Sequence, residues 1–101
     1  MRDIDRQWLE KHRQPYVHNA DEYRQTEWFS YMREQRTMID KCCCMCRVRT
    51  DGLELHHLIY SGWYQEDIDK DVCMLCRQCH EFVTKNYWYN KRIKPFEVVQ
   101  K

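Results

Sequence analysis

The chain has 101 residues, which is the length of one domain. Its composition, 43% apolar and 33% charged, is that of a globular chain and excludes a disordered one. The net charge of +1 excludes a uniformly basic nucleic-acid binder, although residues 85–101 form a local basic patch. Because so short a chain buries a limited core, a bound metal ion would add strongly to its stability.

The N-terminal residues, MRDIDRQWLEKHRQ, contain no apolar segment of the length that a signal peptide needs. No stretch approaches the roughly 18 apolar residues that would span a membrane. We therefore expect a cytoplasmic protein, in which thiols stay reduced. The odd number of cysteines, seven, also argues against a framework built only of disulfides.

Helical patterns come first along the chain. Residues 2–14 are predicted to form an amphipathic helix that Pro15 ends. A second helix is predicted over residues 21–40, and either Asp21 or Thr26 could cap its start. The apolar side of the first helix carries Ile4, Trp8 and Leu9.

Strands are predicted in the middle of the chain. Asp51-Gly52 between two short apolar runs is typical of a hairpin, with strands near residues 47–49 and 53–58. A polar connection follows that is too long for a tight turn. A turn and a helix over residues 77–90 come next, and Pro95 separates a short tail.

Two Cys-x2-Cys pairs, Cys43 with Cys46 and Cys76 with Cys79, indicate a four-cysteine zinc site, because each pair forms a tight turn that directs two thiolates at one ion. An iron–sulfur cluster, a redox pair or unpaired thiols are the alternatives. A register in which Cys42 or Cys44 replaces Cys43 also stays open. Cysteines outside the spacing are expected to be small buried or unused thiols: Cys42, Cys44 and Cys73.

Three histidines lie beside the two arms of this zinc site. His56 and His57 end a predicted strand, and His80 follows the last cysteine at the start of a predicted helix. Because the zinc ion would tie residue 46 to residue 76, we expect the three imidazoles to converge. Successive side chains of a regular strand point to opposite faces, so both strand histidines could enter one site only where the strand ends or twists.

The order of these motifs resembles the HNH endonucleases, which have a ββα-metal (His-Me finger) active site. The matching segments are CCMC, LELHHLIY and DVCMLCRQCHEFVT, with a weaker match in YRQTEWFSYMR, and together they cover about residues 23–85. The resemblance implies an α+β fold: a small zinc-stabilised ββα-metal core with N-terminal helices. It divides the chain into a helical extension (1–20), a nuclease domain (21–90) and a basic tail (91–101).

The resemblance also implies the roles of single residues in hydrolysing a phosphodiester bond. His57 matches the general base that activates water, work for which the ordinary pKa of imidazole, about 6.5, is suited. His56 and His80 match the ligands of one catalytic divalent metal, a Lewis acid. Glu54 matches an acidic position that in some relatives orients a basic side chain on the phosphate.

Two positions depart from the family pattern. Asp71 stands where the family has an asparagine that holds the loop behind the general base, so it lacks the amide donor. Thr84 stands where the family often has a third metal-binding histidine, and its hydroxyl is a weak ligand. Fewer imidazoles and more oxygen ligands favour Mg²⁺ or Mn²⁺, with Ni²⁺ or Zn²⁺ as alternatives.

The resemblance further implies double-stranded DNA as the partner, and small proteins of this kind occur in bacteria, phages and mobile elements. A protein partner or a homodimer through the N-terminal helix is an additional hypothesis. Two other functions stay open: a catalytically silent zinc module that binds DNA or protein, and a zinc-ribbon adaptor with His80 as a spare ligand. Basic residues expected to contact the DNA backbone are Arg47, Arg49, Arg77, Lys85, Lys91 and Arg92.

Overall fold

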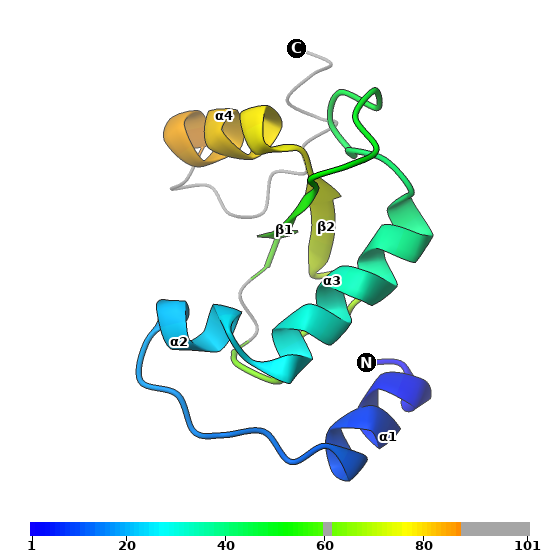
Figure 1. Ribbon diagram of the computed structural model, residues 1–101, viewed down its shortest axis with the longest axis vertical. Coiled ribbons are helices and arrows are strands. Elements are labelled where there is room, and N and C mark those ends of the chain that lie inside the picture. The colour runs from blue at the N-terminus through cyan, green and yellow to red at the C-terminus, as the bar shows by residue number, and fades with distance from the viewer. Residues whose placement is uncertain (60–61, 88–101) are drawn as a thin grey trace.

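The computed structural model describes residues 1–59 and 62–87 (Figure 1). Within these residues helices and strands are mixed, so the α+β prediction is confirmed at that level. The helices are α1 (Asp3–Lys11), α2 (Ala20–Arg24), α3 (Glu27–Asp40) and α4 (Arg77–Tyr87), and the strands are β1 (Glu54–His57) and β2 (Val72–Leu75). No helix in the described part of the chain is both long and apolar enough to cross a membrane.

The N-terminal helix α1 is shorter than predicted, ending at Lys11 rather than at residue 14. Trp8 and Leu9 pack against the core, whereas Ile4 is 61% exposed, so the prediction that Ile4 shares their packed side was wrong. Asp5 takes the buried position instead. Its carboxylate binds the guanidinium of Arg2 at 2.6 Å and the hydroxyl of Tyr31 at 2.7 Å, which satisfies the buried charge.

The helix predicted over residues 21–40 is in fact two helices, α2 and α3. Asn19 caps α2, since its side chain accepts a hydrogen bond from the amide of Glu22 at 2.9 Å. Thr26 caps α3 by accepting from the amide of Phe29 at 3.2 Å. Of the two caps that the sequence allowed, Thr26 is therefore a cap, and Asp21 lies inside α2.

The sheet is antiparallel and joins β1 to β2, with Glu54 opposite Leu75 and His57 opposite Val72. The predicted hairpin around Asp51-Gly52 was wrong, because residues 47–49 form no strand. Arg47 has φ of 60°, which breaks an extended run. The carbonyl of Arg49 accepts a hydrogen bond from the amide of Cys43 at 2.8 Å, so this segment folds back on itself.

Strand β2 was missed from the sequence because its four residues, VCML, are all buried and carry no alternation of apolar and polar side chains. They lie between α3 and α4, as Figure 1 shows, and supply side chains to both. Val72 and Met74 join the core on the α3 side, while Cys73 and Leu75 join a second cluster with Val83 of α4. One face of the sheet therefore packs on the aromatic core, and the other packs on a cluster rich in cysteine.

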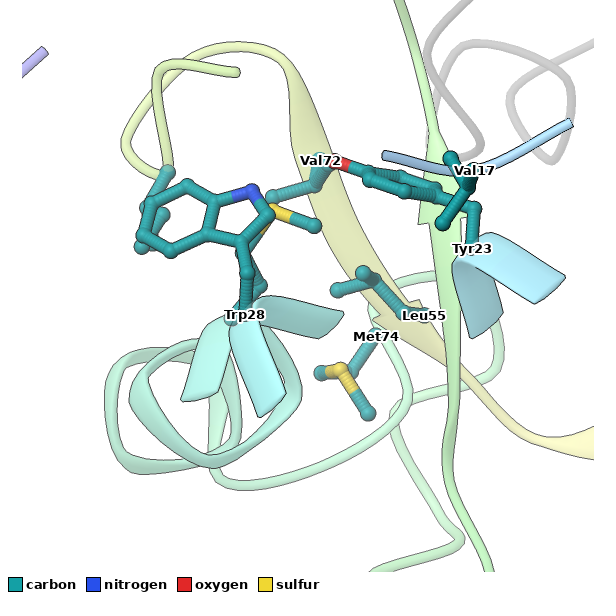
Figure 2. Close-up of a cluster of buried hydrophobic side chains, with 8 residues drawn as sticks. Val17, Tyr23, Trp28, Leu55, Val72 and Met74 are labelled. Carbon is teal, nitrogen blue, oxygen red and sulfur yellow. The ribbon is translucent and has the colours of Figure 1, made fainter. Parts of the chain in front are cut away.

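The core on the α3 side is built around Trp28 and Met32, both fully buried. Figure 2 shows Trp28 and Tyr23 packed over the sheet residues Leu55, Val72 and Met74. Burial of large aromatic side chains dominates the energetics of a core of this size. Trp8 and Val17, from the predicted 1–20 extension, pack on the same cluster, whereas the predicted tail 91–101 lies outside the described residues.

Candidate functional site

Four cysteine sulfurs form a cluster between the first loop after α3 and the start of α4. The Sγ atoms of Cys43, Cys46, Cys76 and Cys79 all lie within 4.8 Å of one another, and Cys46 Sγ is 4.0 Å from Cys76 Sγ. Thiols at these separations can hold a metal ion. These are the two pairs that the sequence spacing singled out.

Local backbone turns bring each pair together. In the first turn the amide of Arg47 donates to the carbonyl of Cys43 at 2.9 Å, and the left-handed conformation of Arg47 closes it. In the second, Cys76 follows β2 and Cys79 lies in the first turn of α4, where the amide of His80 donates to Cys76 O at 2.9 Å. The cluster thus connects the loop before β1 to the helix after β2.

The electrostatic environment of the cluster differs from thiol to thiol. Backbone hydrogen bonds from Arg49 and Val48 lower the pKa of Cys46 to about 6, so this thiol ionises readily. Burial raises the pKa of Cys79, which disfavours a second isolated thiolate. A cation among the four sulfurs would remove this conflict, because it stabilises all the thiolates together.

The other cysteines lie outside the cluster. Cys73 is a residue of β2 that is buried in the second core cluster, and a hydrogen bond with Cys44, followed by burial, raises its pKa. Cys44 is half-buried beside it, and its amide donates to the carbonyl of Met74 at 3.0 Å. Cys42 is also half-buried and takes no part in the four-sulfur cluster.

His56 and His80 meet on the α4 face of the sheet. Their ring centroids are 5.3 Å apart, with the rings at 75° to each other. Glu54, two residues before His56 on the same face of β1, places Oε1 2.8 Å from Nδ1 of His80. Among the described residues, Glu54 thus binds the imidazole of His80 and not a lysine or an arginine.

The charge state of His56 follows from its surroundings. Burial of the ring, with repulsion from His80 and His57, lowers the pKa of His56 to about 4. Its imidazole is therefore neutral at physiological pH, and a neutral imidazole has a lone pair available for a metal ion. No proton has to be displaced when a metal binds to it.

His57 lies on the opposite face of the sheet. Its Nε2 is 2.9 Å from Oε2 of Glu66, and its ring stacks on Phe29 of α3 with centroids 6.3 Å apart. The expected convergence of three histidines therefore holds for His56 and His80 but not for His57. The physical reason is the regular alternation of side chains along β1, which continues through its last residue.

Glu66 was not singled out by the sequence. It is one of several acidic residues in the loop WYQEDIDKD, and nothing in that composition distinguishes it. In the folded chain it is 1% exposed and is hydrogen-bonded to His57, Tyr23 and Trp28. Only the arrangement of α2, α3 and β1 around the loop shows that this carboxylate belongs to the histidine site.

Asp71 is the last residue of the long loop between β1 and β2, and it binds the backbone just after His57. Its backbone carbonyl accepts hydrogen bonds from the amides of Leu58, at 2.7 Å, and Ile59, at 3.2 Å. Its Oδ2 also accepts from the amide of Asp67 at 2.8 Å. Asp71 thereby restrains the backbone on both sides of the loop, including the residues that follow His57.

Residues of α4 beyond His80 line a shallow groove. Thr84 lies one helical turn from His80, and the groove is lined by His80, Glu81, Thr84 and Lys85. Thr84 and Lys85 are exposed. The hydroxyl of Thr84, the ammonium group of Lys85 and the carboxylate of Glu81 therefore lie on one open surface of α4 beside His80.

The predicted DNA-contacting arginines lie on the surface around the cysteine cluster. Arg47 and Arg49 are exposed on the first turn of the cluster. Arg77 is exposed at the start of α4, where its guanidinium binds Glu81 at 3.2 Å. Lys91 and Arg92 lie outside the described residues.

Comparisons of the chain with protein-family models, with curated proteins and with solved structures found no match.

Proposed function

We propose that the protein is a metal-dependent DNA endonuclease of the HNH type, hydrolysing phosphodiester bonds. The observation that carries this proposal is the meeting of His56 and His80 from two different elements, with Glu54 at Nδ1 of His80. A histidine that binds a metal through one nitrogen commonly donates its other N–H to a carboxylate, which fixes the tautomer. With Nδ1 directed at Glu54, His80 has Nε2 for the metal.

The order of elements supports the proposal. β1, β2 and α4 follow one another as strand, strand and helix, and the cysteine cluster lies between the loop before β1 and the start of α4. We propose zinc as the ion in this cluster. A tetrahedral zinc site with Zn–S bonds of about 2.3 Å separates its sulfurs by about 3.8 Å, and the Cys46–Cys76 separation is 4.0 Å.

The second ion is proposed to be Mg²⁺ or Mn²⁺, held by His56 and His80 with further oxygen ligands. When bound, this ion supplies Lewis acidity to the scissile phosphate. His56 and His80 would hold this ion, and Thr84 and Lys85, on the same helix as His80, are proposed to contact phosphate oxygens. Arg47, Arg49 and Arg77 are proposed to bind flanking phosphates, which position DNA without reading its sequence.

His57 is proposed as the general base that takes a proton from the attacking water. It is the last residue of β1, and its side chain is 14% exposed, so it borders the solvent at the end of the strand. Asp71 restrains the backbone that follows. A carboxylate on one nitrogen of an imidazole, as Glu66 provides here, stabilises the ring once it has accepted a proton at the other nitrogen.

One observation favours a second function, the catalytically silent zinc module that binds DNA or protein. His57 contacts Glu66 and Phe29 on the α3 face, whereas His56 and His80 meet on the α4 face. If DNA cannot bridge the end of β1 to reach both faces, the chain binds but does not cut.

A plasmid-nicking experiment separates the two functions. We expect the wild type to nick supercoiled DNA with Mn²⁺ or Mg²⁺ and to lose this activity in EDTA. His57→Ala and His80→Ala should each lower the rate by about 100-fold or more, the usual range for general acid–base groups and metal ligands. His12→Ala and His18→Ala, at exposed positions, are matched controls and should nick normally.

Equal nicking by His57→Ala and the wild type would contradict the general-base assignment. Absence of nicking by the wild type in every metal, while DNA is still retarded on a gel, would favour the silent module. Zinc content and thermal unfolding of each variant show whether a lost activity reflects lost folding.

A further inference from the structure

The hydrogen-bond network around Glu66 determines which nitrogen of His57 can exchange a proton. Both carboxylate oxygens of Glu66 have partners from separate elements. The hydroxyl of Tyr23 is 2.7 Å from Oε1 and 2.6 Å from Oε2, and the indole Nε1 of Trp28 is 3.2 Å from Oε1. Nε2 of His57 is 2.9 Å from Oε2.

The direction of these hydrogen bonds follows from the chemistry of the donors. The indole nitrogen of Trp28 can only donate. The hydroxyl of Tyr23 accepts from the amide of Tyr64 at 3.0 Å, and its own proton therefore points to Glu66. Figure 2 shows the indole nitrogen of Trp28 and the hydroxyl of Tyr23 directed toward each other across the core cluster.

Glu66 is therefore ionised and acts only as an acceptor. Burial works against the charge, but hydrogen bonds from His57, Tyr23 and Trp28 lower the pKa of Glu66 below its ordinary value. An ionised carboxylate has no proton to donate, so a ring nitrogen 2.9 Å from Oε2 has to carry one. A lone pair facing Oε2 at that distance would be repelled.

We infer that Glu66 is a positioning residue that keeps a proton on Nε2 of His57, so that any proton exchanged with water or substrate passes through Nδ1. The assignment holds for the neutral and for the charged ring, because both keep the proton that Glu66 accepts. Its catalytic consequence rests on the proposed function: the general base would act through Nδ1. The assignment of the proton itself does not depend on catalysis.

The isosteric substitution Glu66→Gln gives a sharp test, because the surrounding donors orient the new amide. Trp28 can only donate, so the amide oxygen takes the place of Oε1 beside it. The amide NH₂ then takes the place of Oε2 and donates to His57. The ring must accept there, and its proton moves to Nδ1. The substitution is thus expected to reverse the tautomer of His57.

The tautomer can be read from two-bond ¹H–¹⁵N correlations of the imidazole rings in the zinc-loaded protein, at mildly alkaline pH and without another divalent metal. His57 is identified among the five histidines by its absence in His57→Asn. We expect the Nε2–H pattern in the wild type and the Nδ1–H pattern in Glu66→Gln. Asp5→Asn removes a different buried carboxylate and should leave the wild-type pattern unchanged.

An Nδ1–H pattern, or a mixture of tautomers, in the wild type would overturn the inference without any need for a variant. An unchanged pattern in folded Glu66→Gln would overturn it as well. The first result remains decisive even if Glu66→Gln does not fold.

The catalytic consequence is tested by steady-state nicking with Mn²⁺. Because Nδ1 carries a proton in Glu66→Gln, kcat should fall by about 100-fold or more with KM unchanged. Normal kcat in a variant with a reversed tautomer would refute proton transfer through Nδ1. If the wild type does not nick DNA at all, the proposed function fails, and the tautomer measurement alone decides the role of Glu66.

Discussion

His56 and His57 are adjacent in sequence, yet the sheet gives them different partners and different chemistry. His56 is half-buried and lies against the ring of His80, and His57 lies against the carboxylate of Glu66. The first arrangement disfavours a protonated ring, and the second stabilises an N–H donor. At the scale of a residue, the face of the strand therefore decides the role of the histidine.

The pH dependence of His56 can be predicted from its surroundings. The folded chain has a pKa of about 4 at His56, below the ordinary value of 6.5. Between these two values the unfolded chain binds a proton that the folded chain does not, so stability falls as pH falls through that window. Well above pH 6.5 the ring is neutral in both the folded and the unfolded chain, so this loss of stability is absent there.

The size of this effect is measurable by urea unfolding of the zinc-loaded protein. Between about pH 7 and about pH 5 we expect the wild type to lose about 1–2 kcal/mol more than His56→Asn, with allowance for the partial exposure of the ring. A ring titration of His56 near 6.5, followed by NMR, would contradict the expectation.

At the scale of an element, the junction between α2 and α3 positions the two side chains that bind Glu66. The hydroxyl of Thr26 accepts from the amide of Phe29 and donates to the carbonyl of Tyr23 at 2.7 Å, so it joins the end of α2 to the start of α3. Tyr23 and Trp28, one on each helix, both bind Glu66. The junction between α2 and α3 thus helps to position the carboxylate.

Removal of the Thr26 hydroxyl should therefore weaken the fold. Thr26→Val keeps the shape of the buried side chain but loses both hydrogen bonds, and we expect it to lower the free energy of unfolding by about 1–2 kcal/mol. Thr26→Ser should retain most of the stability. Thr37→Val, whose hydroxyl bonds within the exposed side of α3, is a matched control with an expected change near zero. Chemical denaturation of all variants measures the differences, and equal stability of Thr26→Val and wild type would refute the role of this cap.

At the scale of the whole molecule, the cysteine cluster connects segments far apart in sequence. It joins the loop after α3 to the beginning of α4, and the elements described between them are two four-residue strands. A two-stranded hairpin is at best marginally stable alone. The proposed zinc ion would hold α4, and with it His80, against β1.

Loss of a zinc ligand should therefore affect the whole fold. Structural zinc sites bind with about 10–16 kcal/mol, comparable to the entire stability of a small domain. We expect Cys43→Ser and Cys76→Ser to lose zinc in dialysed samples and to lose cooperative thermal unfolding. Cys42→Ser, a neighbouring thiol outside the cluster, is the matched control and should keep both. A stable wild-type protein free of zinc would contradict the proposed ion.

Local patterns in the sequence were enough for much of the architecture. The paired Cys-x2-Cys spacing predicted the cluster that Cys43, Cys46, Cys76 and Cys79 form, and the helix predicted after Cys76 matches α4 from its first residue. The turn within each pair and the helical period depend on neighbouring residues alone, whereas the meeting of the two pairs was inferred from the four thiolates that one zinc ion takes. The break at Thr26 was weaker in the pattern, because a cap in mid-sequence also fits a continuous helix.

Only the tertiary structure decided the partners of the sheet and of the histidines. β1 pairs with VCML across a long loop rather than with residues 47–49, since pairing depends on contacts that local pattern does not encode. Glu66 resembles its acidic neighbours until Tyr23 and Trp28 enclose it. The sequence by itself determined that the chain carries a four-cysteine cluster beside three histidines. The fold decided that His56 faces His80 and that His57 faces Glu66, because strand alternation and burial assign neighbours to opposite sides of one sheet.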